Sequence, residues 1–195
     1  MRAFVVLSVT MLGAGLVSQA TTVALPKIFA ERLGGLTDGG ILGAGGFVTL
    51  VFLVSSGAQI VGGWLADRYP LKHVYLWSWA LQLPIFVLAV KLFDAPLLLA
   101  MAATQCLAVF ATPAENSLLV RYTPARWRAT AFGAKFVLAL GVSSAAVPLV
   151  ALTYDKTGDF LWLFLSLGAF AAIIVAAGLF LPGAARPTAV VQAAE

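Results

Sequence analysis

The stretch GGWLADRYPLKHVY, residues 62–75, gathers charge in a chain that is otherwise poor in it. It contains Asp67, Arg68, Lys72 and His73, whereas only 10% of the 195 residues are charged and 62% are hydrophobic. Soluble domains are roughly 45–50% apolar. Eight acidic and twelve basic residues cannot cover the surface of a soluble protein of this size. The composition predicts an integral membrane protein, with this charged stretch in a loop between two spans.

Long apolar segments follow one another along the whole chain. Six can be drawn, each long enough to cross roughly 30 Å of hydrocarbon, at residues 3–29, 40–66, 71–92, 96–122, 127–154 and 160–181. Helices are expected, because backbone in lipid must satisfy its own hydrogen bonds and no segment alternates polar and apolar residues as a membrane strand does. Prolines inside the segments are expected to kink them, at Pro26, Pro84, Pro113 and Pro148. The sequence predicts an all-α membrane protein, with a six-helix bundle over 1–182 and a disordered cytoplasmic tail over 183–195.

Lysine and arginine are unequally divided between the two ends of these segments. The side of the N-terminus holds seven, namely Arg2, Arg68, Lys72, Arg121, Arg126, Arg128 and Arg186. The opposite side holds four, namely Lys27, Arg32, Lys91 and Lys156. The positive-inside rule therefore predicts a multi-pass protein of the bacterial inner (plasma) membrane with both termini in the cytoplasm. The first segment also resembles a cleavable signal peptide, an alternative that leaves the orientation of the other spans unchanged.

Asp67 is not explained by membrane orientation, because acidic residues contribute little to the positive-inside rule. A carboxylate is stabilised near a helix N-terminus, where free N–H groups and a partial positive charge are found. A fixed contact between Asp67 and a neighbouring helix end is therefore one interpretation of the loop. The other is that the loop only supplies orienting charge.

The loop resembles the cytoplasmic signature of the major facilitator superfamily of transporters, Gly-x-x-x-Asp-Arg-x-Gly-Arg-Lys. Four positions match in register, namely Gly63, Asp67, Arg68 and Lys72. Pro70 replaces the second glycine of the signature and Leu71 replaces its arginine. The resemblance covers residues 3–181. The degenerate signature and the absence of the glycine-rich antiporter motif suggest the C-terminal half of such a transporter, which has two three-helix repeats.

The resemblance implies secondary active transport of a small solute by alternating access, with the solute held between two six-helix bundles. The implied partners are a coupling ion such as a proton, the lipid bilayer, and a second six-helix half from this or another chain. The alternative is a non-transporting assembly or regulatory subunit, or an inactive fragment, that retains the fold. No cofactor, metal or nucleic acid is expected. An enzyme is not expected either, because paired mid-span aspartates, an HExxH motif and a serine with a basic partner are all lacking.

The resemblance also implies two groups of site residues. The expected gating motif comprises Gly63, Asp67, Arg68, Lys72, Arg121 and Arg126. In it, Asp67 is expected near the N-terminal end of the span that begins at Trp127, with Arg121 or Arg126 close by. The first and fourth helices are expected to line the substrate cavity, with Gln19, Thr22, Gln105 and Glu115. The alternative for the glutamines and threonines is that they bridge neighbouring helices by hydrogen bonds.

Glu115 and Lys135 are two charges set within spans. Either charge alone costs about 2.5–3.5 kcal/mol at a helix centre. Both lie on consecutive spans at a similar depth on the cytoplasmic side, so we expect an ion pair, direct or bridged by water. Two alternatives stay open, namely that Lys135 extends to the membrane interface and that Glu115 takes up a proton in ion coupling.

Overall fold

The computed structural model describes residues 2–37 and 43–181, and within these residues it contains helices and no strands. The helices are α1 (Arg2–Arg32), α2 (Gly34–Thr37), α3 (Ala44–Arg68), α4 (Leu71–Ala89), α5 (Asp94–Tyr122), the 3-10 turn η1 (Ala125–Trp127), α6 (Arg128–Ser144), α7 (Ala146–Thr157) and α8 (Leu161–Leu179). The predicted all-α class is confirmed for this part of the chain. The predicted tail over 183–195 lies outside the described residues, as do the first positions of the predicted segment 40–66.

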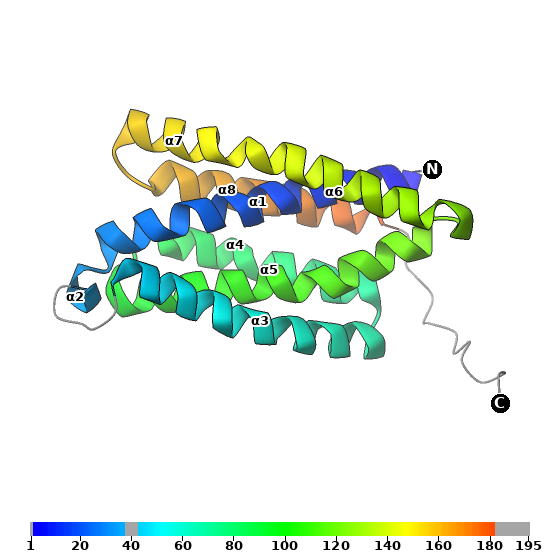
Figure 1. Ribbon diagram of the computed structural model, residues 1–195, viewed down its shortest axis with the longest axis horizontal. Helices are drawn as coiled ribbons and strands as arrows, with labels where there is room; N and C mark the ends of the chain where they lie inside the picture. Colours follow the sequence, from blue (N-terminus) through cyan, green and yellow to red (C-terminus); the bar gives the residue numbers. More distant parts are fainter. Residues whose placement is uncertain (1, 38–42, 182–195) are drawn as a thin grey trace.

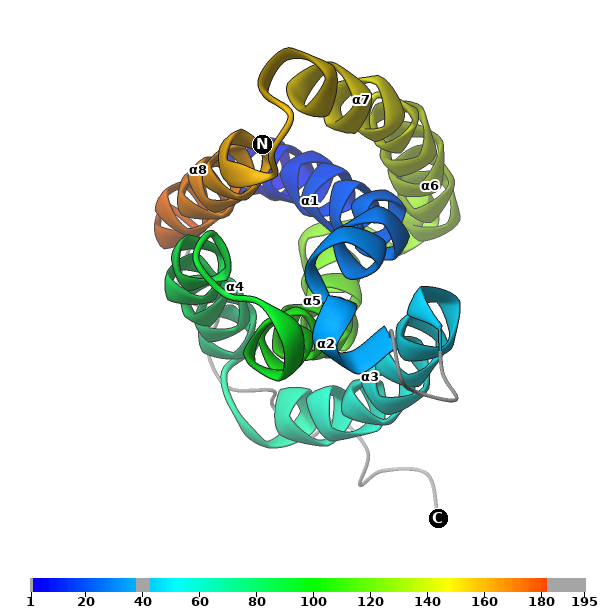
Figure 2. The ribbon, with the colours of Figure 1, turned by 90° about the vertical axis from the view of Figure 1, so that its left-hand side faces the viewer.

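Four helices form a ring, in which α1 packs on α8, α8 on α4, α4 on α5, and α5 on α1. Figure 2 shows this ring end-on, with α3 on the outer side of α5 and with α6 and α7 along the outer side of α1. All the long helices run along the long axis of the molecule (Figure 1). The end of α3, the turn from α5 to α6 and the end of α8 lie at the same end of the bundle as the N-terminus. This is the end that the charge distribution predicts to be cytoplasmic.

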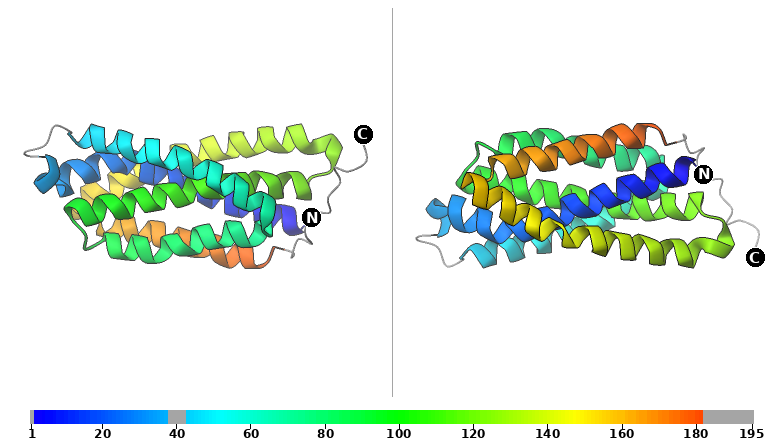
Figure 3. Two further views of the ribbon diagram at one scale, coloured as in Figure 1. Left: turned by 90° about the horizontal axis from the view of Figure 1, so that it is seen from below. Right: turned by 90° about the horizontal axis from the view of Figure 1, so that it is seen from above.

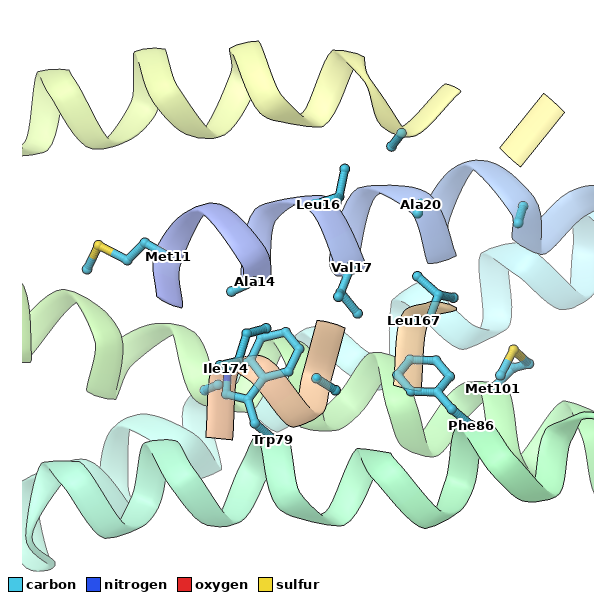
Figure 4. Close-up of a cluster of buried hydrophobic side chains, with 14 of the residues drawn as sticks. Met11, Ala14, Leu16, Val17, Ala20, Trp79, Phe86, Met101, Leu167 and Ile174 are labelled. Atoms are coloured by element: carbon cyan, nitrogen blue, oxygen red, sulfur yellow. The ribbon is translucent and has the colours of Figure 1, made fainter. Parts of the chain in front are cut away.

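The interior of the ring is filled by apolar side chains from all four helices (Figure 4). Val17 of α1, Phe86 of α4, Met101 of α5 and Leu167 of α8 are each at most 1% exposed. Lipid tails are as apolar as these side chains, so burial from water gains little between spans in a bilayer. Close van der Waals packing is then the term that holds the helices together.

The number of membrane spans is only partly settled by helix length and composition. Four described helices are long and apolar enough to cross a membrane, namely α1 from Val6, α3, α5 and α8. Helix α4 has 19 residues, but Lys72, His73 and Gln82 lower its mean hydropathy. Helices α6 and α7 have 17 and 12 residues, and each alone is too short. The expected six spans are therefore not confirmed and stay a prediction.

The break between α6 and α7 follows from Pro148. Proline has no N–H, and its ring clashes with the carbonyl four residues earlier; here that residue is Ser144, where α6 ends. The N–H of Ala145 donates instead to the carbonyl of Val142 at 3.0 Å, three residues back. The other three prolines differ, because α1, α4 and α5 continue through Pro26, Pro84 and Pro113.

The backbones of α3 and α5 lie close together at Gly62. A Cβ atom at this position would lie 2.3 Å from the carbonyl oxygen of Phe110 and 2.9 Å from its Cα. Backbone cannot yield as a flexible side chain can, so Gly62→Ala is expected to force the two helices apart. We expect a loss of about 1–3 kcal/mol of stability, measured as a lower apparent Tm in detergent. Gly57→Ala is the control, because its Cβ meets nothing within 4 Å, and equal shifts in the two variants would contradict the prediction.

Candidate functional site

Two charged side chains meet between α5 and α6, in the half of the bundle nearer the N-terminus. Lys135 Nζ lies 2.8 Å from Glu115 Oε1 and donates a hydrogen bond of 2.5 Å to Asn116 Oδ1. Both partners are largely enclosed, with side-chain exposures of 11% for Lys135 and 10% for Glu115. The two residues expected to pair are thus in direct contact. The ammonium is satisfied by two acceptors within the protein and does not need to reach the membrane interface.

A small cavity lies beside this pair. Its volume is about 90 Å³, and its lining comes from three helices: Ser8, Met11 and Leu12 of α1, Leu119 of α5, and Ala131, Ala134, Lys135 and Ala139 of α6. A water needs about 10–15 Å³ of such volume and at least two polar partners. Lys135 and Ser8 are the polar side chains of the lining, so water or one polar group of a solute fits beside the ammonium.

Of the four residues expected to line a substrate cavity, Glu115 pairs with Lys135, two contact each other and one stands apart. Gln105 of α5 is 5% exposed, and its Nε2 donates to Thr22 Oγ1 of α1 at 3.3 Å. Thr22 Oγ1 in turn donates to the carbonyl of Ser18 at 2.9 Å. This contact bridges two helices, as the alternative interpretation describes. Gln19, in the middle third of α1, has its side chain exposed instead.

The residues of the expected gating motif lie around the turn between α3 and α4, at the end of α5 (Arg121) and in the turn η1 (Arg126). Asp67 and Arg68 are exposed, and the Arg68 guanidinium lies 4.1 Å from the ring centre of Trp64. Within residues 2–37 and 43–181, no ion pair joins Asp67 to Arg121 or Arg126. Gly63, on the last turns of α3, has open space beside its Cα. The gating role of the motif stays a prediction.

Lys72 makes a contact that the sequence analysis did not predict. Its ammonium donates to the carbonyl of Leu179, the last residue of α8, at 2.8 Å and to that of Leu181 at 2.5 Å. A cation is favourable at a helix C-terminus, where carbonyl groups lack intrahelical partners. Lys72 therefore ties the start of α4 to the end of α8.

Arg32 makes the corresponding contact at the opposite end of the bundle. Its guanidinium donates to the carbonyls of Ala89 and Val90, at 3.3 and 3.1 Å, and so caps the end of α4. It also pairs with Asp159, which precedes α8. Three phenylalanine rings surround it, with centres 5.2–5.7 Å from the guanidinium carbon, from Phe93, Phe160 and Phe164. The sequence predicts Arg32 only as an orienting charge in a loop, but in the structure its side chain is enclosed, at 7% exposed.

A second contact at this end holds α7 against α1. Tyr154 donates from its hydroxyl to Glu31 Oε1 at 2.6 Å, and Lys27 Nζ lies 3.2 Å from the centre of its ring. Lys27 and Glu31 are one helical turn apart, so they face α7 together.

A metal site is not found among the described residues. They contain no group of three or more His, Cys, Asp or Glu side chains placed to hold an ion.

Comparison with known proteins identifies the family. The family model described as Major Facilitator Superfamily matches residues 7–195, which is nearly the whole chain. No curated protein matches the sequence of this chain. The resemblance seen at the loop 62–75 is therefore confirmed at the level of the family, whose members are transporters and not enzymes. With four helices apolar enough to cross a bilayer, the chain is an integral membrane protein. It belongs to the Major Facilitator Superfamily.

Proposed function

We propose that the chain is one six-helix half of a secondary active transporter, which moves a small solute by alternating access. In this proposal the six spans are α1, α3, α4, α5, the broken pair α6 and α7, and α8. They form two three-helix repeats in the bacterial inner membrane, with both termini in the cytoplasm. The driving force is a proton gradient or the gradient of the solute itself, since the sequence contains no nucleotide-binding motif.

Exposed amide side chains near the middle of two apolar helices support this proposal. Gln19 in α1 and Gln59 in α3 are both exposed, and both helices are long and apolar enough to cross a membrane. Lipid cannot satisfy an amide group, so polar residues in spans face a water-filled cavity or another protein. Gln105 and Thr22 add a polar contact between α1 and α5.

A site at mid-membrane needs walls from two bundles. We therefore infer that the second wall is another six-helix half, which belongs to the same polypeptide or to a separate chain. The residues 1–195 alone would then carry flux only as a self-associated pair or together with a second half.

Flux measurements on the purified chain test this proposal. The chain is reconstituted in proteoliposomes and assayed for uptake of radiolabelled sugars, amino acids, and organic cations and anions, while its mass is measured by light scattering. Flux with a mass of two copies, or only after co-expression of a second half, is the expected result. A single copy that carries flux would overturn the need for a second wall. A stable complex with another membrane protein and no flux of any solute would favour an assembly or regulatory subunit.

Asp67→Asn tests the gating role of the loop between α3 and α4. The carboxylate is exposed at the end of the bundle, where it is free to meet a helix N-terminus of a second half as the bundles move. Losing such a contact costs about 0.3–2 kcal/mol, so the initial rate of uptake is expected to fall about two- to thirtyfold. The yield of inserted protein stays unchanged.

The control for this variant is Asp155→Asn, an exposed carboxylate on α7 at the other end of the bundle. Its uptake rate is expected to match that of the unchanged chain. Normal uptake in Asp67→Asn would remove the gating role and leave the loop with orienting charge alone.

A further inference from the structure

A wide apolar groove opens between α3 and α4 near their connecting turn. Figure 3 (left) shows the two helices converging at this turn, with α5 between them. The cavity volume is about 530 Å³, within the roughly 300–1,000 Å³ that is typical of small-molecule sites. Its walls include Trp64, Tyr69, His73, Trp77 and Leu81, and its floor includes Phe110 of α5.

The aromatic walls of the groove are open to the surroundings of the protein. The exposed fractions are 50% for Trp64, 64% for Trp77 and 48% for Leu81. Trp64 belongs to α3, which is apolar enough to cross a membrane and whose most apolar stretch is only 11% buried, and Trp77 and Leu81 belong to α4. Tryptophan and tyrosine gather where the hydrocarbon of a bilayer meets its headgroups. The groove is therefore placed where an acyl chain can enter it from the side.

The turn end of the groove offers hydrogen-bond donors and positive charge. Tyr69 and His73 line it, and Arg68 lies over Trp64, a wall residue, at 4.1 Å. Arg68 and Asp67 of the same turn both lie outside the lining, but Arg68 is held against the groove by its contact with Trp64. The Lys72 ammonium is engaged at the end of α8, so Arg68 supplies the fixed charge at this rim.

We propose that this groove binds one anionic phospholipid, with an acyl chain along the aromatic walls and the headgroup phosphate at Arg68, Tyr69 and His73. An arginine matches a phosphate in geometry as well as in charge, because its planar fork of N–H groups can bind two oxygens at once. The acyl chain of a neutral lipid would pack against the aromatic walls equally well, but its headgroup would bind Arg68 less strongly. The lipid specificity thus resides in Arg68 and the affinity for a chain resides in Trp64 and Trp77.

Native mass spectrometry of the purified chain tests the proposal. The chain is equilibrated in detergent with equal amounts of phosphatidylglycerol and phosphatidylcholine that carry the same acyl chains, and the retained lipid is counted. One phosphatidylglycerol per chain is expected, at about a fivefold preference, since a basic residue near an anionic lipid contributes about 1 kcal/mol. Arg68→Gln is expected to remove the preference, and Arg68→Lys to keep most of it. Trp77→Ala is expected to reduce the retention of both lipids.

Matched controls come from a second arginine–tryptophan pair on the surface. The Arg126 guanidinium lies 5.8 Å from the ring centre of Trp127, and Trp127 is 52% exposed, but Trp127, unlike Trp64, does not line the groove. Arg126→Gln and Trp127→Ala are therefore expected to retain lipid as the unchanged chain does. Equal retention of the two lipids by the unchanged chain would overturn the proposal. So would equal losses in the Arg68 and Arg126 variants. Both readouts are independent of solute flux, so they stand or fall separately from the proposed transport function.

Discussion

Lys135→Met is expected to lower the yield of folded protein several-fold, because it leaves the Glu115 carboxylate enclosed without the ammonium that lies 2.8 Å away. Breaking a buried pair by removing one partner costs about 3–5 kcal/mol, which is a large share of the roughly 5–15 kcal/mol that stabilises a folded protein. Glu115→Gln is expected to lower the yield less, since Lys135 keeps Asn116 Oδ1 as an acceptor. The readout is the monodisperse fraction in size-exclusion chromatography after solubilisation.

Two double variants test whether the loss of yield in the single variants comes from an unpaired enclosed charge. Glu115→Gln with Lys135→Met leaves no enclosed charge, and Glu115→Lys with Lys135→Glu restores a pair in the opposite sense, so both are expected to recover part of the yield. Lys156→Met, an exposed lysine of α7, is the control for loss of a positive charge. Wild-type yield in both single variants, with loss of flux in Glu115→Gln alone, would replace the structural pair by a role in ion coupling.

The contact between Glu115 and Lys135 was predictable because the two charges stand out in apolar spans. Counting residues from the middle of each span gives their depth, and consecutive spans joined by a short loop are neighbours. The contacts of Lys72 and Arg32 could not be found in this way. Lys72 binds carbonyls of Leu179 and Leu181, and backbone carbonyls have no signature in sequence. Partners so far apart along the chain meet only once the helices are packed.

The positions of the six predicted segments agree well with the helices of the structure, whereas only four of these helices are long and apolar enough to count as membrane spans. Each segment corresponds to one helix or, for 127–154, to α6 and α7 together. The sequence marked Pro148 as a kink but did not reveal that α6 would end at Ser144. Four prolines in apolar segments have equal local chemistry, and only packing decides which helix continues. The groove between α3 and α4 could not be predicted for the same reason, because its walls come from two helices and form only when these pack on α5.

Arg32→Met is expected to give the second large loss of stability. It removes two charged hydrogen bonds to the end of α4, each worth about 1.5–3 kcal/mol, and leaves the Ala89 carbonyl with only the long hydrogen bond of 3.4 Å from the Leu92 N–H. We expect a loss of about 3 kcal/mol or more, seen as a lower apparent Tm in detergent. Arg32→Lys keeps the charge, but a single ammonium lacks the planar fork that reaches α4 and Asp159 together, so little stability is recovered. Lys91→Met, an exposed base at the same end, is the control.

The Asp159→Asn variant shows how much of the stability that Arg32 provides comes from its ion pair and how much from its hydrogen bonds to α4. Its side chain is 54% exposed, so water replaces the arginine when the pair is broken, and Asp159→Asn is expected to cost no more than about 1 kcal/mol. In a double-mutant cycle, most of the loss in Arg32→Met should then persist in the Asp159→Asn background, because it comes from the carbonyls of Ala89 and Val90. If Asp159→Asn alone lowered the apparent Tm as far as Arg32→Met does, the ion pair and not the cap on α4 would join these three helix ends.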